Sequence, residues 1–210
     1  MRRMQAGEAL SVWRWLLAGQ WRLIGTTEPL LGRTLEAHDQ RGARLLTAKL
    51  CRLITEMAFL QERRYRPYDK WLGTAFAELD AAATLGPLID AALQRPPVSA
   101  PDSSLSRALL TLGHRHTALA ISQPVIPTIG DFQVNINNAV RPYPVLNTGE
   151  FVTATTCAIT DPALRGLVAV GGVDQLTHAD DALINFTRWP GELTQTYRRL
   201  LARTRDQPAE

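Results

Sequence analysis

Residues 43–67 read ARLLTAKLCRLITEMAFLQERRYRP, and this stretch decides the fold. Its large apolar side chains recur every three or four positions, which places them on one face of a helix: Leu46, Leu50, Leu53, Met57 and Leu60. Basic residues gather just before Pro67, where the negative end of the helix dipole would lie, and the proline stops the helix. We predict one long helix that begins between Gly32 and Glu36 and ends near Tyr65.

The segment before it has the same periodicity. Residues 8–24 carry apolar side chains at helical spacing, and three of them are tryptophans, a large apolar area that other elements must cover. We predict a helix over 8–24 that Gly25 closes.

Shorter helices are predicted downstream. One begins after Pro67 with Asp69 as its cap, is broken at Gly86 and Pro87, and resumes over 88–93. Ser103 or Ser104 caps another that runs to Leu119. Further helices are predicted over the ranges 151–159, 162–167 and 192–203.

Residues 121–150 have a different composition, rich in proline and asparagine, with a short alternating stretch at 133–137 that predicts a strand. The predicted fold is therefore all-α. It is a single domain over 1–210 with its core at about 8–205, built as an antiparallel helical bundle with this long irregular connection packed over one face.

The composition excludes several classes of protein. A formal net charge of +3 on interleaved charges argues against nucleic-acid binding, which usually needs a dense basic stripe. No apolar run approaches a membrane span, and the amphipathic N-terminal segment differs from a signal peptide. With only Cys51 and Cys157 far apart in the chain, we expect reduced thiols and a cytoplasmic location.

Residues 62–76, ERRYRPYDKWLGTAF, resemble a signature of the domain-of-unknown-function 4037 family. Residues 141–146 (RPYPVL), 171–176 (GGVDQL) and 15–25 (WLLAGQWRLIG) are similar to the family in the same order, so the resemblance spans about 9–184.

The resemblance implies the helical half of a two-part nucleotidyltransferase-like protein, a half that helps bind acceptor and nucleotide. A catalytic head would need a Gly-Ser turn and an Asp-x-Asp or Asp-x-Glu pair for two magnesium ions, and neither occurs. We therefore expect no nucleotidyl transfer by this chain alone, no metal ligands and no cofactor. The chain also has Thr117 after His116 and Asn147 after Leu146, where the family tends to have asparagine and histidine.

One candidate site lies around the turn at Pro67. Arg52 and Glu56 are four residues apart and face the same way, so the carboxylate would stay ionised among cations and serve as a base or anchor. Lys70 is placed to contact an anion at a helix N-terminus, with Tyr68 and Trp71 as binding residues. The alternative is a salt-bridged corner that fixes the angle between two helices, with Trp71 and Phe76 as core residues.

Other candidates lie elsewhere in the chain. His116 and Asp174 are further acid–base candidates, and Tyr143 and Gln175 further ligand-binding residues.

Two patterns each have a functional and a structural interpretation. Arg107 and His114 share a helix face at a spacing similar to that of helical ribonuclease toxins, although a histidine in such a helix is more often structural. His178 with Asp180 and Asp181 would supply polar groups to a pocket mouth, and the two aspartates equally fit a helix cap.

These observations lead to a small-molecule-binding helical domain, with an apolar pocket suited to a specialised metabolite. Were it an enzyme of metabolite biosynthesis, its chemistry would be cofactor-independent acid–base catalysis. The alternative is an interaction subunit, or a ribonuclease toxin-like protein, paired with a separate nucleotidyltransferase-like partner. Self-association is expected where apolar surface is left uncovered.

Overall fold

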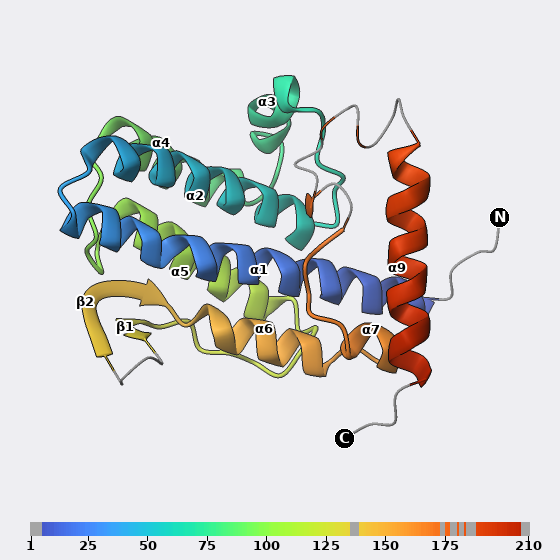
Figure 1. The fold of residues 1–210 in the computed structure, drawn as a ribbon. Coiled ribbons are helices and arrows are strands. Elements are labelled where there is room, and N and C mark those ends of the chain that lie inside the picture. The colour runs from blue at the N-terminus through green and yellow to red at the C-terminus, as the bar shows by residue number, and fades with distance from the viewer. Residues whose placement is uncertain are drawn as a thin grey trace.

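Two long helices, α1 (Ala6–Glu36) and α2 (Gln40–Gln61), lie side by side at the centre of the molecule (Figure 1). The computed structural model describes residues 6–134, 139–172, 175–176, 180, 183 and 188–206. The described part is predominantly helical, which confirms the predicted fold class. None of its helices is long and apolar enough to cross a membrane.

The remaining helices pack around this pair. After a 3-10 turn (Asp69–Trp71) come α3 (Leu72–Phe76), α4 (Ala82–Gln94) and α5 (Ser104–Ala118), which has Ser103 as its cap. The C-terminal part holds α6 (Thr148–Cys157), α7 (Pro162–Arg165) and α9 (Trp189–Asp206). The edge-on contact between Trp15 and Tyr197, with ring centroids 5.9 Å apart, brings α9 against α1.

The apolar face predicted for residues 46–60 forms the centre of the core. Leu50, Leu53 and Met57 are buried, and Leu46 and Leu60 are half-buried against the same cluster. Trp21 of α1 stacks on Phe151 of α6 with ring centroids 4.6 Å apart, so the C-terminal part shares this core.

The predicted end of the first helix at Gly25 is wrong. The helix continues through Gly25 and Pro29 to Glu36. Gly25 lies against the side chain of Thr148, where an added Cβ would clash, so its small size serves the close approach of α6.

The second helix is correspondingly shorter than predicted at both ends. His38 adopts a positive φ of 56°, and Asp39 caps α2 by accepting a hydrogen bond of 2.8 Å from Gly42 N–H. At the other end α2 stops at Gln61, because Arg63 takes a left-handed conformation with φ 54°.

Two further predictions near Pro67 are corrected. Asp69 makes ion pairs with Arg52 and Arg66 and caps no helix through its side chain. Helix α4 also passes through Gly86 and Pro87 without the predicted break.

The connection at 121–150 is more regular than predicted. Strands β1 (Ile129–Val134) and β2 (Ala139–Leu146) form an antiparallel pair, and residues 135–138 lie outside the described residues. The pairing shifts from Asp131↔Pro144 to Phe132↔Arg141, which leaves an irregularity in β2 around its prolines. The sheet leads directly into α6 beside α1.

Candidate functional site

A pocket of about 730 Å³ opens between the first half of α1 and the end of α2. Its walls are mostly apolar: Ala9, Leu10, Trp13, Leu16, Phe59 and Leu60. Polar side chains line the rest of it: Gln20, Glu56, Arg63, Arg64, Tyr65, Arg66 and Gln175. A concave, largely apolar site with a few polar groups is typical of small-molecule binding.

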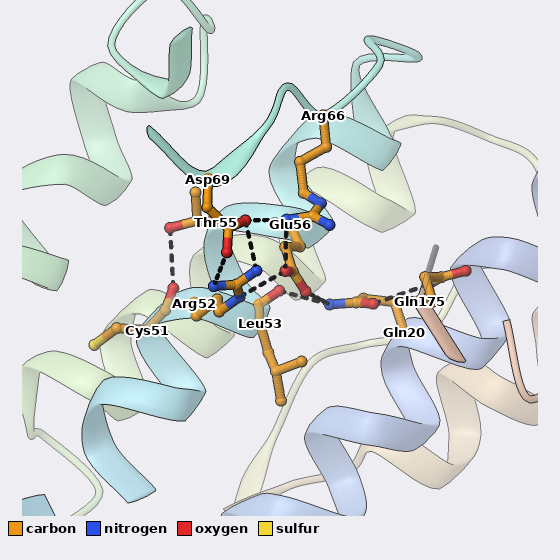
Figure 2. Close-up of polar contacts among 9 residues, drawn as sticks. All are labelled: Gln20, Cys51, Arg52, Leu53, Thr55, Glu56, Arg66, Asp69 and Gln175. Carbon is orange, nitrogen blue, oxygen red and sulfur yellow. Dashed lines mark hydrogen bonds and ion pairs between the residues drawn. The ribbon is translucent and has the colours of Figure 1, made fainter. Parts of the chain in front are cut away.

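Four charged side chains form a network at one end of this pocket, shown in Figure 2, which we call the charged corner: Arg52, Glu56, Arg66 and Asp69. Arg52 holds Asp69 through two hydrogen bonds of 2.8 and 3.0 Å and reaches Glu56 at 3.0 Å. Arg66 lies 2.9 Å from Asp69 and 3.5 Å from Glu56, and only 11% of its side chain is exposed.

The charged corner is electrically balanced, with two cations and two anions. The hydrogen bonds from Arg52 are the main cause that lowers the pKa of Asp69, and the same contact raises the pKa of Arg52. Both groups therefore stay charged at neutral pH. This geometry ties the turn after α2 to α2 itself, which supplies the ion pairs of the salt-bridged corner. Trp71, which that interpretation places in the core, is 54% exposed.

Two glutamine side chains at this end of the pocket extend the hydrogen-bond network from the charged corner (Figure 2). Gln20 Nε2 donates to Leu53 O at 3.0 Å and to Glu56 Oε2 at 3.4 Å. Gln175 Nε2 donates to Gln20 Oε1 at 2.9 Å, and Gln175 Oε1 accepts from Gly172 N–H at 2.7 Å. Because Gln20 is fully buried, these bonds orient its amide and hold the C-terminal segment over the pocket.

The end of α2 and the residues just after it form another part of the pocket wall. Arg64 N–H donates to Phe59 O at 3.0 Å and Arg63 N–H to Leu60 O at 3.2 Å, the paired bonds of a Schellman motif. Trp13 Nε1 also donates to Leu60 O at 2.6 Å. The guanidinium of Arg63 lies over the Trp13 ring, 3.9 Å from its centroid.

The structure brings three of the predicted site residues together. Glu56 and Gln175 line the pocket, and Arg52 contacts Glu56 directly. Tyr68, Lys70 and Trp71 follow on the outer side of the turn and are exposed.

Those three outer residues do not line the pocket. Lys70 Nζ lies 5.0 Å from the centroid of the Trp71 ring, in a 3-10 turn of three residues. The turn is too short for the predicted anion contact at a helix N-terminus.

His116 lies in the core, apart from the pocket. Its side chain is 1% exposed, Nδ1 accepts from Trp21 Nε1 at 3.0 Å, and Nε2 is 3.1 Å from Thr155 Oγ1. Because Nδ1 accepts, the neutral ring carries its proton on Nε2 and donates to the threonine. Burial lowers the pKa of His116 to about 4, so the geometry fits a structural histidine.

Tyr143 is also buried away from the pocket, where it stacks on Phe132 with ring centroids 5.7 Å apart. Asp174, His178 and Asp181 lie outside the described residues. Asp180 Oδ1 accepts a hydrogen bond of 3.2 Å from Leu183 N–H, and the capping and pocket-mouth interpretations of this segment both stay predictions.

The pair proposed from helical ribonuclease toxins does not meet in a pocket. Arg107 and His114 are both exposed on α5, and Arg107 lines a separate cavity of about 440 Å³ that does not include His114. In the described part of the chain, no group of three or more His, Cys, Asp or Glu residues could hold a metal ion.

Trp13, Gln20 and Arg63 are among the pocket-lining residues that sequence reasoning missed. The only signals in the sequence are a glutamine on an apolar helix face and an arginine at the end of a helix, and neither is specific. Their partners lie 47, 33 and 50 positions away, so local periodicity could not identify them.

Comparison with known families supports the resemblance for part of the chain. The family model described as a domain of unknown function (DUF4037) matches residues 10–72, which confirms the predicted resemblance over that segment. The matched segment includes every pocket-lining residue except Ala9 and Gln175. Searches of curated proteins and of solved structures gave no match.

Proposed function

We propose that this protein binds a small molecule in the pocket between α1 and α2. The observation that carries the proposal is the combination of mostly apolar walls with an ordered polar end, where Glu56, Gln20 and Gln175 are linked by hydrogen bonds. The volume of about 730 Å³ lies within the usual range for ligand sites, roughly 300–1,000 Å³.

The polar end is suited to orient a ligand more than to bind it tightly. Its charges compensate one another, so it adds no net attraction, whereas apolar walls contribute affinity in proportion to the area they cover. A metabolite with an apolar body and one or two polar substituents fits such a pocket, in which the walls bind the body and the polar end orients the substituents. Specialised metabolism and a cytoplasmic location belong to the same proposal, and the two unpaired cysteines, Cys51 and Cys157, support the location.

Of the predicted acid–base residues that the structure describes, Glu56 is the one placed to act in this pocket. It is the one carboxylate among the described pocket-lining residues, and Lys70 and His116 do not line the pocket. Cofactor-independent catalysis stays a prediction. A Glu56→Gln variant that kept binding but lost turnover of a ligand would support it.

Binding is tested with the neutral fluorescent probe N-phenyl-1-naphthylamine, whose emission rises in apolar sites. Leu10→Trp fills the pocket from a half-buried position on α1, and we expect affinity to fall at least about tenfold because the dye loses its apolar contacts. Leu45→Trp is the matched control, since Leu45 is 69% exposed on α2 and does not line the pocket. Equal affinities for wild type and both variants would contradict the proposal.

One observation favours the alternative of an interaction subunit. Three aromatic side chains on the turn after α2 are exposed: Tyr65 at 85%, Tyr68 at 66% and Trp71 at 54%. Exposed aromatic clusters are typical of protein–protein contacts. Sedimentation of wild type and of Trp71→Ser over a range of concentrations tests whether this surface drives self-association.

A further inference from the structure

We propose that the pocket between α1 and α2 is selective for organic anions: ligands with a flat apolar body and one oxyanion group, such as a carboxylate, sulfonate or phosphate, that pairs with Arg63. This inference rests on the proposed function because it concerns the same pocket.

The first argument is the charge balance of the pocket. Three arginines and one glutamate line it. Arg66 is compensated by the two carboxylates of the charged corner, at 2.9 and 3.5 Å, and Arg64 is paired with Glu78 at 3.3 Å. Among the side chains that the structure describes, the ion pairs give Arg63 no carboxylate partner, so within that set one positive charge at the pocket is uncompensated.

The second argument is the backbone conformation of Arg63. Its φ of 54° lies in the left-handed region, and in a Schellman motif this position is usually glycine because a Cβ is strained there. Strained residues cluster at functional sites, where the strain positions a side chain. Here the strained residue carries the guanidinium that lies over Trp13 at the pocket.

The third argument is the chemistry of a stacked guanidinium. An arginine that lies over an aromatic ring uses its flat face for that contact and keeps its in-plane N–H groups for a planar oxyanion. Trp13 and the adjacent apolar walls, including Leu10 and Leu60, would then cover the flat body of the same ligand.

The test compares two dyes that share one aromatic body. The anionic dye 1-anilinonaphthalene-8-sulfonate carries a sulfonate, and N-phenyl-1-naphthylamine lacks it. Arg63→Gln removes the charge, and we expect it to lower the affinity for the anionic dye about fivefold, a value reduced because the guanidinium is exposed. The affinity for the neutral dye should change less than about twofold. Added salt should lower the affinity for the anionic dye only, because it screens the charge pair.

Two further variants make the result interpretable. Arg44→Gln removes the same charge from an exposed position on α2 outside the pocket and should leave both dyes unchanged. Arg63→Gly removes the guanidinium while relieving the backbone strain, so it tests the charge even if Arg63→Gln folds poorly.

The possible outcomes separate this inference from the proposed function. A selective loss of the anionic dye in both Arg63 variants supports the inference. Equal effects of Arg44→Gln and Arg63→Gln, or no effect of either Arg63 variant, overturn it while leaving binding in the pocket intact. Indifference of both dyes to Leu10→Trp overturns the proposed function and the inference together.

Discussion

Replacing Glu28 by glutamine should stabilise the protein above pH 7 and make little difference below pH 5. Glu28 lies on α1 and is 6% exposed, and its two carboxyl oxygens each lie 3.1 Å from Leu146 N, whose N–H they accept. Burial raises the pKa of Glu28 from 4.5 to about 8, and the hydrogen bond from Leu146 only partly opposes this effect.

The sign of the pH effect follows from the two pKa values. In the unfolded chain the carboxyl group loses its proton near pH 4.5, whereas in the folded protein it keeps it up to about pH 8. The stability linked to this proton is therefore fully present below pH 4.5 and is lost as the pH rises towards 8. At roughly 1.4 kcal/mol per pH unit, the loss is about 3 kcal/mol at pH 7 and about 5 kcal/mol above pH 8.

Glutamine keeps the shape of the neutral carboxyl group and cannot ionise. Urea unfolding at pH 5, 7 and 8.5 should show the stability advantage of Glu28→Gln growing from under about 1 to about 3 kcal/mol or more. Glu36→Gln on the same helix is the control, because the Glu36 side chain is 54% exposed and should show no such trend. A difference between Glu28→Gln and wild type that is constant across this pH range would refute the reasoning.

Three further predictions concern packing and charge. Gly19→Ala should destabilise the protein by about 1–3 kcal/mol, since the new Cβ would meet backbone atoms at 2.7 and 2.8 Å. Gly149→Ala, at an exposed position in α6 with open space around it, should instead stabilise the protein by up to about 1 kcal/mol; urea unfolding measures both, and equal signs would be inconsistent with this packing. The imidazole signals of His116, followed by NMR, should not shift between pH 8 and 5.5, because burial lowers the pKa of the folded-state ring to about 4. The contribution of the neutral ring to the free energy of unfolding is complete above pH 6.5 and falls by about 3 kcal/mol as the pH drops to 4. A titration midpoint near 6.5 would rule out the buried neutral ring. Arg66→Met should lower the stability measured by thermal unfolding by about 1–3 kcal/mol, and Arg64→Met by under about 1 kcal/mol. The difference is expected because Arg66 is mostly buried between two carboxylates, whereas the ion pair of Arg64 is exposed. A larger loss for Arg64→Met than for Arg66→Met would contradict the stabilising role of the charged corner.

Helix content was predictable because it depends on local periodicity. The apolar spacing of residues 46–60 identified the face that forms the core, and Ser103 was one of the two residues predicted to cap α5. Helix ends were less predictable. Gly25 looks like a terminator in sequence, yet it lies inside α1, where the missing side chain makes room for Thr148, far along the chain.

The candidate site was predictable only where its members are close in sequence. Arg52 and Glu56 are four residues apart on one helix, and their ion pair was expected. His116 was a reasonable acid–base candidate by residue type, but its hydrogen bonds to Trp21 and Thr155 make it a core residue. Those partners are 95 and 39 positions away, and no local pattern indicates them.

The sequence by itself determined the helical character of this protein and the apolar faces of its helices, because both are properties of neighbouring residues three and four positions apart. Only the tertiary structure decided that Gln20 meets Gln175, 155 positions later, and that a pocket lies between α1 and the end of α2. A pocket is the space left between segments that pack from distant parts of the chain. Its position therefore depends on how those segments meet, which local periodicity does not specify.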